Sequence, residues 1–286
     1  MLSSIWGSAF LSIKIAVNEV HPISVASLRL IIAALFLYTY FKIKKFKFEL
    51  TKSDLILIGL IGLIGNFIPF SLISWAEIYI QSNTAGLLLS VAPIIALILS
   101  HFFTNDDKFT LNKFISIFIG LLGVLLIFGY NPFNKTTLNI YNNLFPKIAI
   151  ILAAFGYVIS SILAYNLKHI NIFTLTTFVT IFAAFISFPF LIYSEFLNPS
   201  NFNFGSLLPI IYLGIFPTAI AFLIRFYLIS KAGPIFLSYV AYLIPIFAIF
   251  WGYIFLKETI SLYTSIGVIL ILLGVYIGRK SNEKNS

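Results

Sequence analysis

Two charged side chains, Lys14 and Arg29, lie inside long apolar stretches of the first half of the chain, and a third, Glu77, closes another such stretch. A charge at membrane depth costs at least a few kcal/mol, so it is retained mostly where it serves a site. Counted along the expected helices, all three lie in the same half of the membrane. The positions of the second half that match Lys14 and Arg29 are Leu163 and Val179, which are apolar. Because architecture alone would keep both halves alike, the asymmetry indicates a charged site.

Each charge also has a plainer interpretation. The amine of Lys14 could extend outward to the lipid–water interface, and Glu77 could simply be exposed at a helix end. Arg225 lies near the inner end of another apolar stretch and is expected to extend to the surface in the same way. Arg29 is flanked at helical spacing by alanines, which favour contact with other helices over contact with lipid. We therefore expect Arg29 to face a cavity, with Glu77 or a substrate carboxylate as its counter-charge.

Uncharged polar and aromatic side chains could complete a substrate pocket. Trp6, Phe10 and Lys14 follow i, i+4, i+8 spacing and share one helix face. Asn66 lies mid-helix, where its amide needs a hydrogen-bonding partner. The other candidates for contact with substrate are Trp75, Tyr157, Tyr239 and Tyr242. For each Trp and Tyr the alternative is plain packing or a belt at the membrane surface.

No combination of residues points to catalysis. The histidines, His21, His101 and His169, fall at helix ends, and the sequence has no His-x-x-x-His, Glu-x-x-His or Gly-x-Ser-x-Gly motif. It has no stretch that resembles a nucleotide-binding loop. The chain has no Cys, which excludes disulfides and thiolate metal sites. We therefore expect neither an enzyme nor a cofactor or metal site.

The composition is that of an integral membrane protein. Of 286 residues, 60% are hydrophobic and 9% are charged, against about 25% charged in soluble domains. The mean hydropathy is +1.04. The net charge of +9 comes from basic residues between the apolar stretches and not from one continuous face. A lipid bilayer is therefore the expected partner, and nucleic acid is not.

Ten apolar stretches follow one another along the chain, each roughly 18–23 residues long, enough for a helix to cross a ~30 Å hydrocarbon core. No alternation typical of a membrane β-barrel is present. The sequence predicts an all-α integral membrane protein with ten transmembrane helices. The expected limits are 2–19, 22–41, 54–76, 83–103, 111–130, 146–166, 171–193, 206–228, 234–255 and 262–279.

The distribution of Lys and Arg predicts the orientation. With the N-terminus inside, the cytoplasmic side receives Lys42, Lys44, Lys45, Lys47, Lys52, Lys108, Lys113, Lys168, Lys231, Arg279, Lys280 and Lys284. The outside receives only Lys135, Lys147 and Lys257. Basic residues accumulate in cytoplasmic loops, so both termini are expected in the cytoplasm.

The second half of the chain repeats landmarks of the first. Pro93 to Asp106 and Pro245 to Glu258 both span 13 residues, and glycines follow each acid. A unit of five spans used twice places its two copies upside down to each other, as in many secondary transporters. We expect a first repeat over 1–130, a connecting loop over 131–145, a second repeat over 146–280 and a short cytoplasmic tail over 281–286.

Two features of the repeat leave alternatives open. Pro93 and Pro245 are expected mid-helix, where proline removes a backbone hydrogen bond, so they form either a matched pair of hinges or two static kinks. The glycines of the fifth and tenth spans either pack helices within one chain or form a homodimer interface. The oligomeric state is therefore monomer or homodimer.

Together these residues resemble the EamA-type members of the drug/metabolite transporter superfamily over nearly the whole chain. The resemblance is carried by Trp6-Gly7, Arg29 in SLRLIIAALFL, Trp75-Ala76-Glu77 with Ser82 and Ala85, and the Pro93 and Pro245 blocks with Glu258 and Gly274. The chain departs from the family at Asp106-Asp107, where one Glu after a Gly is usual. The resemblance implies two facing five-helix bundles, a substrate cavity between them and export of small metabolites by alternating access.

The expected function is secondary transport of a small molecule, amino-acid-like or another small organic solute, across the plasma (inner) membrane. Proton coupling is left open. The alternative is a lipid or polyprenyl-phosphate flippase of the same architecture, whose cationic pocket would open sideways to lipid. The basic loop KIKKFKFELTK is expected to touch anionic lipid heads.

Overall fold

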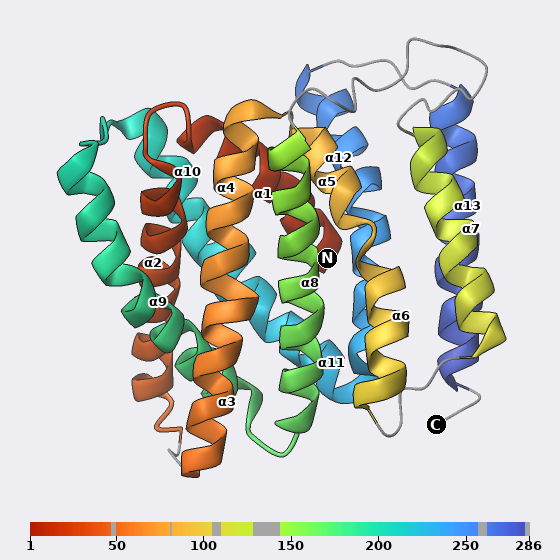
Figure 1. Cartoon of the computed structure of the whole chain (residues 1–286), viewed down its shortest axis with the longest axis horizontal. Helices are drawn as coiled ribbons and strands as arrows, with labels where there is room; N and C mark the ends of the chain where they lie inside the picture. The colour runs from red at the N-terminus through yellow and green to blue at the C-terminus, as the bar shows by residue number, and fades with distance from the viewer. Residues whose placement is uncertain (47–49, 81, 105–109, 128–143, 257–261, 284–286) are drawn as a thin grey trace.

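The computed structural model describes residues 1–46, 50–80, 82–104, 110–127, 144–256 and 262–283. Within these ranges all regular structure is helical (Figure 1). The acids of the repeat, Asp106 and Glu258, lie outside the described residues, as do most of the connecting loop and several of the lysines that predict the orientation.

The helices of the first half are α1 (Leu2–Ala16), α2 (Pro22–Ile43), α3 (Lys52–Gly62), η1 (Leu63–Phe67), α4 (Ile68–Tyr79), α5 (Ser82–Leu89), α6 (Ala92–Phe103) and α7 (Leu111–Ile127). Those of the second half are α8 (Leu144–Asn166), α9 (Ile172–Leu197), α10 (Phe204–Leu213), η2 (Gly214–Ile220), α11 (Ala221–Ser238), α12 (Val240–Leu256) and α13 (Leu262–Glu283). The short π-helices η1 and η2 join their neighbours into two long continuous helices.

Five helices in the described part of the chain are long and apolar enough to cross a membrane. They are Pro22–Ile43, Lys52–Tyr79, Leu144–Asn166, Ile172–Leu197 and Phe204–Ser238. Shorter apolar helices accompany them, among them Leu2–Ala16 and Ala92–Phe103. The helix α13 continues to Glu283, so the predicted tail over 281–286 begins within it.

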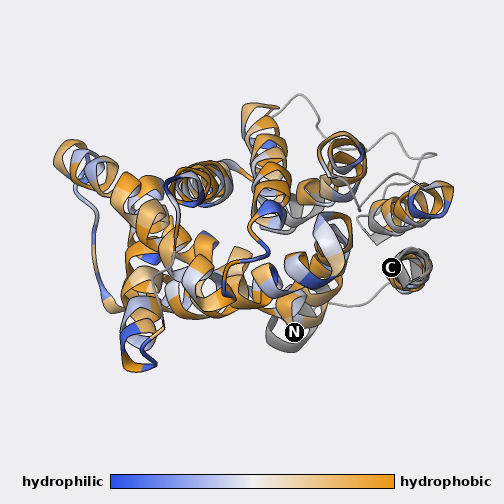
Figure 2. Cartoon of the chain, turned by 90° about the horizontal axis from the view of Figure 1, so that it is seen from below, coloured by the Kyte–Doolittle hydropathy of each residue, from blue (hydrophilic) through white to orange (hydrophobic). Residues whose placement is uncertain are grey.

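Hydrophobic residues predominate along the helices of this bundle (Figure 2), and many large apolar side chains are exposed. On α9, Phe185 and Phe196 are 77% and 82% exposed, although each is a large aromatic side chain. Monomeric soluble proteins rarely expose apolar patches of this kind, which mark contact with a membrane or a partner. Together with the apolar helices, the surface describes a multi-pass membrane protein.

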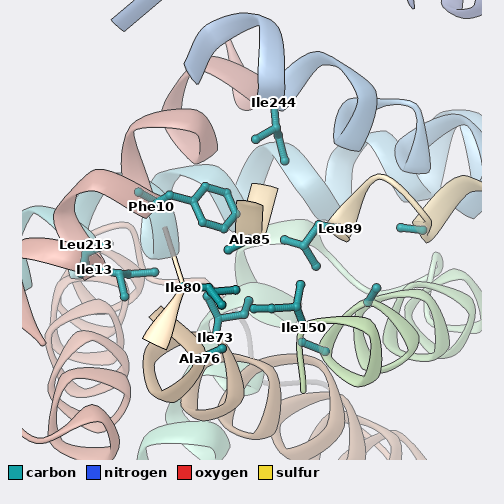
Figure 3. Packing of buried hydrophobic residues seen from close by; sticks show 14 of the residues in the cluster. Phe10, Ile13, Ile73, Ala76, Ile80, Ala85, Leu89, Ile150, Leu213 and Ile244 are labelled. Carbon is teal, nitrogen blue, oxygen red and sulfur yellow. The ribbon is translucent and has the colours of Figure 1, made fainter. Parts of the chain in front are cut away.

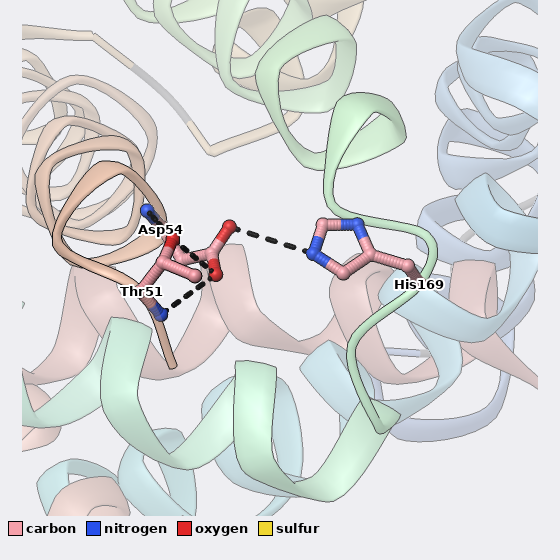
Figure 4. Close-up of polar contacts among 3 residues, drawn as sticks. All are labelled: Thr51, Asp54 and His169. Carbon is pink, nitrogen blue, oxygen red and sulfur yellow. Dashed lines mark hydrogen bonds and ion pairs between the residues drawn. The ribbon is translucent and has the colours of Figure 1, made fainter. Parts of the chain in front are cut away.

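Local sequence explains where several helices begin. Pro22 opens α2 directly after His21, whose imidazole accepts a hydrogen bond from the amide of Ile23. Thr51 and Asp54 form a reciprocal capping box at the start of α3. Figure 4 shows the Asp54 carboxylate between Thr51 and His169, whose Nε2 lies 3.4 Å from it. The start of α3 is thereby tied to the loop between α8 and α9.

The two prolines of the repeat occupy different places. Pro245 lies inside α12, as expected. The expectation that Pro93 lies mid-helix is wrong, because α5 ends at Leu89 and Pro93 belongs to the first turn of α6. Proline is tolerated there since the first amides of a helix have no intrahelical partner. A second break falls at Gly233, whose φ of 81° favours glycine and redirects α11 before Pro234.

The glycines of α7 and α13 pack these helices against each other within the chain. A Cβ at Gly123 would lie 2.6 Å from the carbonyl oxygen of Gly267, and one at Gly274 would lie 2.6 Å from that of Ser116. The two helices run side by side (Figure 1). The sequence left open whether these glycines pack helices within one chain or form a homodimer interface. The contacts at Gly123 and Gly274 lie within one chain.

The core joins the two halves. Phe10 and Ile13 of α1 and Ile73 of α4 lie in one buried cluster with Ile150 of α8 and Ile244 of α12 (Figure 3). Because this cluster is built by both halves, any cavity at their junction has walls from each.

Candidate substrate-binding site

A cavity lies between α1, α2, α4, α5 and α6 of the first half and α8, α11 and α12 of the second. The space inside it, about 840 Å³, includes open solvent at its mouth. Its lining is Trp6, Ala9, Phe10, Ile13, Arg29, Phe70, Ile73, Leu89, Ala92, Tyr157, Val158, Ser161, Phe222, Arg225, Pro234, Leu237, Ser238, Ala241 and Ile244. Apolar side chains dominate, and the charged ones are two arginines.

Arg29 enters the cavity wall from α2 and is 2% exposed. Its Nε donates a 3.1 Å hydrogen bond to Thr218 Oγ1 in η2. Its guanidinium carbon lies 3.8 Å from the ring centroid of Phe70, a close cation–π contact. Arg29 is therefore held on one face by an aromatic ring and at Nε by a hydroxyl of the opposite half.

Arg225 is the second arginine of the cavity, and the expectation that it extends to the surface is wrong. It is 2% exposed, because α11 continues past it to Ser238 and packs it against α8. Nη2 donates to the carbonyl of Tyr157 at 3.2 Å, to Ser161 Oγ at 3.1 Å and to Ser160 Oγ. Nη1 is buried and has no hydrogen-bond partner in the part of the chain described.

Tyr157 lies within electrostatic reach of both arginines. The guanidinium carbon of Arg225 is 5.9 Å from its ring centroid. Trp6 closes another part of the wall and donates from Nε1 to the carbonyl of Pro217 at 3.1 Å. Of the nine candidates for contact with substrate, Trp6, Arg29 and Tyr157 are the ones that the structure brings together in this cavity.

Lys14 and Glu77 form a separate polar centre beside the cavity. Lys14 Nζ donates to the backbone carbonyls of Glu77 and, at 3.2 Å, of Ile80, so it binds the C-terminal end of α4. The alternative that Glu77 is exposed is wrong, because its side chain is completely buried. Both of its carboxylate oxygens lack a hydrogen-bond partner among the described residues. The carboxylate lies within electrostatic reach of Lys14 and Arg29.

The remaining candidates lie outside the cavity lining. Asn66 is completely buried in η1, with no partner for its amide in the described chain. Trp75 is 37% exposed and packs edge-on against Tyr79. Tyr239 shares a 2.7 Å hydrogen bond with Ser116, and Tyr242 donates to the carbonyl of Ile117 at 2.8 Å. Tyr242 of α12 and Tyr239, which lies between α11 and α12, thus contact α7.

The sequence interpretation missed Arg225, Phe70 and Phe222 as cavity residues. Phe222 and Phe226 lie 5.4 Å from the guanidinium carbon of Arg225. Aromatic residues three before and one after an intramembrane arginine were an available signal, since such rings cover a buried cation. Among the described residues, no cluster of three or more His, Cys, Asp or Glu could hold a metal ion.

Comparison with known proteins identifies relatives along the whole chain. The model of the EamA-like transporter family matches residues 1–129 and 144–278. An uncharacterized transporter of Archaeoglobus fulgidus is 31% identical, covering 95% of this chain and 94% of that protein. The uncharacterized transporter YoaV of Bacillus subtilis is 24% identical over 96% of this chain and 92% of its own length.

A further relative is the protein PagO of Salmonella typhimurium, 24% identical over 97% of this chain and 90% of its own length. A solved crystal structure matches with a TM-score of 0.77 at 15% identity, covering 99% of this chain and 96% of that one, so the fold is shared. The first relatives are named as transporters and not as enzymes. The predicted resemblance is confirmed: this chain belongs to the EamA-like transporter family.

Proposed function

We propose that this membrane transporter is a secondary transporter that exports a small organic solute by alternating access. The observation that carries the proposal is the cavity between the two halves, where Arg29 and Arg225 are buried and have no salt bridge to a carboxylate of the described residues. Buried charges of this kind are costly and usually serve a substrate or ion pathway. The solute binds in this cavity, with Trp6 and Tyr157 in its wall.

Ten spans in two inverted repeats are part of the proposal, and matching helix starts support it. The capping box of Thr51 and Asp54 opens α3, and that of Asn203 and Ser206 opens α10, each residue 152 positions after its counterpart. In Figure 1 the two caps lie at opposite ends of the bundle, as an inverted repeat requires. His169 contacts the first cap and Glu19 the second, so even their neighbours correspond.

The packing around the π-helices supports the same arrangement. A Cβ at Gly62 would lie 3.0 Å from the carbonyl oxygen of Val179, and one at Gly214 would lie 3.1 Å from that of Arg29. Gly62 precedes η1 and Gly214 begins η2, and Val179 corresponds to Arg29 in the repeat. Each half therefore packs its π-helix on the second helix of the other half. We take 1–130 and 146–280 as the two repeats.

The proposed orientation places both termini in the cytoplasm of a plasma (inner) membrane. The end of α2, with exposed Lys42 and Lys44, lies at the same lower end of Figure 1 as the end of α13. The start of α3, which carries Lys52, lies at that end too, and basic residues accumulate on the cytoplasmic side.

Alternating access requires the two halves to rock around the cavity. Pro245 inside α12 and the break at Gly233 lie on either side of a segment that lines it, including Leu237 and Ala241. We assign the hinge of the second half to this segment. Pro93, at the start of α6, is the corresponding hinge of the first half. One chain forms the whole cavity, so the proposed working unit is a monomer.

The flippase alternative is less well supported. A flippase for lipid needs a cationic groove open to the bilayer. Arg29 and Arg225 are each 2% exposed and have walls from both halves around them. Burial of both guanidinium groups between the two halves favours a small solute over a bulky lipid.

Metabolite profiling of cells and medium tests the proposal. Cells that overproduce the native protein should accumulate one or more metabolites in the medium, relative to cells that overproduce an Arg29→Ala variant found in the membrane at equal amount. Equal profiles with both proteins would contradict a cavity-based export function. Loss of lipid asymmetry without a change in soluble metabolites would favour the flippase.

A further inference from the structure

We infer that the substrate is a small organic anion that carries no cationic group, its anionic end held between Arg29 and Arg225 and its apolar body against the aromatic wall. This inference rests on the proposed transport function and deepens it by naming the substrate class. It narrows the broader proposal, which admits amino-acid-like zwitterions.

The charge of the cavity is the first step. As far as the structure describes it, the lining contains two guanidinium groups and no Asp or Glu. Within the described chain, no carboxylate comes within 4.0 Å of a nitrogen of either arginine. Glu77 lies within electrostatic reach of Arg29 but is not part of the lining. An anion in the cavity would therefore supply the missing counter-charge.

The partners that the arginines do have leave room for such an anion. Arg29 is fixed by one hydrogen bond from Nε to Thr218 and by its stacking on Phe70. Arg225 directs Nη2 to α8, while its Nη1 is buried without a partner. A guanidinium offers five N–H donors, so donors remain on each group for a carboxylate or phosphate oxygen. Tyr157 lines the same cavity as both arginines, and its ring centroid lies 5.9 Å from the guanidinium carbon of Arg225.

The rest of the lining disfavours other solutes. A zwitterion or a cation needs an acceptor for its ammonium group, and leaving a buried ammonium unpaired is costly. A polyol needs many hydrogen bonds, but beyond the arginines the polar side chains of the wall are Tyr157, Ser161 and Ser238. The remaining wall is apolar, with Phe10 and Phe222 among its larger rings. An anion with an aromatic or aliphatic body fits these surroundings.

A matched set of three compounds tests the charge requirement directly. 3-Phenylpropionate, phenylalanine and phenethylamine share one phenethyl body and are an anion, a zwitterion and a cation. Their affinity for the full chain in detergent is measured by titration calorimetry. We expect 3-phenylpropionate to bind at least about tenfold more tightly than phenylalanine, and phenethylamine not to bind. Phenyl phosphate, a second soluble anion, should also bind.

Variants connect the binding to the two arginines. Arg225→Gln and Arg29→Gln should each weaken 3-phenylpropionate at least about tenfold, since each removes a charged donor. Lys231→Gln and Lys42→Gln are the matched controls, because each removes one exposed positive charge from the same helix and should change nothing. Arg225→Lys keeps the charge and should restore part of the affinity. Thermal melting of each variant identifies any that fails to fold.

Several results would overturn the inference. Affinity for phenylalanine or phenethylamine equal to that for 3-phenylpropionate would do so. Folded Arg29→Gln and Arg225→Gln proteins that bind 3-phenylpropionate with native affinity would do so as well. Failure of both soluble anions to bind at millimolar concentration would also overturn it. Farnesyl phosphate distinguishes the source of the anionic group: arginine-dependent binding of this lipid alone would assign the site to a lipid. Calorimetry measures binding and does not depend on transport. If these binding predictions failed, export detected by metabolite profiling would still support the proposed transport function.

Discussion

Arg29 Nε and Thr218 Oγ1 are joined by a 3.1 Å hydrogen bond that connects α2 of the first half to η2 of the second. The Thr218 hydroxyl donates its own proton to the carbonyl of Leu213 at 2.7 Å, which leaves its lone pairs for Arg29. Both side chains are buried. The position of a cavity arginine therefore depends on the opposite half, and a rocking motion of the halves would change it.

Thr218→Val removes this acceptor while it keeps the shape of the side chain. We expect anion affinity and transport to fall at least about tenfold, because a hydrogen bond to a charged group contributes roughly 1.5–3 kcal/mol. Transport into proteoliposomes and calorimetric binding measure the effect. Thr39→Val on the exposed face of α2 is the control. Native affinity in a folded Thr218→Val protein would mean that Phe70 alone positions Arg29.

Close helix contact at Gly156 gives a prediction about stability. A Cβ at this position would lie 2.5 Å from the carbonyl oxygen of Ile64, a backbone atom of η1 that cannot rotate away. Gly156→Ala should therefore destabilise the protein by ~1–3 kcal/mol, seen as a lower melting temperature in detergent. Gly59→Ala is the control, since its nearest contact, Phe182, would be at an ordinary 3.8 Å. Equal melting of the two variants would contradict this contact.

The sequence was sufficient for the helical membrane fold, because hydropathy and loop charge are properties of local segments. It also identified Arg29, whose neighbouring alanines share its helix face. It could not place Arg225, because burial of that residue depends on how far α11 extends and on the packing of α8 against it. The position of Pro93 was wrong for a similar reason. The sequence predicted one helix with Pro93 in its middle, because no local signal other than the proline marks the break between α5 and α6. Long-range packing decided each of these cases.

The paired helix caps predict equal effects at two distant places. Thr51→Ala and Asn203→Ala each remove a capping box from the start of a long apolar helix. Each should lower stability by about 1 kcal/mol, the usual loss for an N-cap residue. Thermal melting measures both, and Ser53→Ala, an exposed residue in the first turn of α3, is the control. Strongly unequal losses of stability would count against the proposed equivalence of the starts of α3 and α10.

Topology can be tested on a natural cysteine-free background. Asn18 follows α1 and Asn166 ends α8, and both are exposed at corresponding places of the proposed repeats. In intact cells an impermeant maleimide should label Asn18→Cys, whereas Asn166→Cys should react only after permeabilisation. Labelling of both from one side would refute the inverted repeat. The opposite pattern would keep the repeat and reverse its orientation.

Glu77 offers the last prediction, which concerns energy coupling. Its buried carboxylate has no hydrogen-bond partner in the described chain and lies within electrostatic reach of Lys14 and Arg29. Gain or loss of one proton there changes the charge beside a cavity arginine by one unit, so proton and anion occupancy should be linked.

Glu77→Gln fixes this charge with almost the same shape. If Glu77 carries the coupling proton, the variant should still exchange substrate across proteoliposomes but should no longer accumulate it in response to a pH gradient. Glu19→Gln, which changes an exposed carboxylate after α1, should respond like the native protein. Both variants should insert normally, because neither adds a charge to an apolar helix. If Glu77→Gln still accumulates substrate in response to the pH gradient, Glu77 is a structural partner of α1. Any proton coupling would then be assigned to another group.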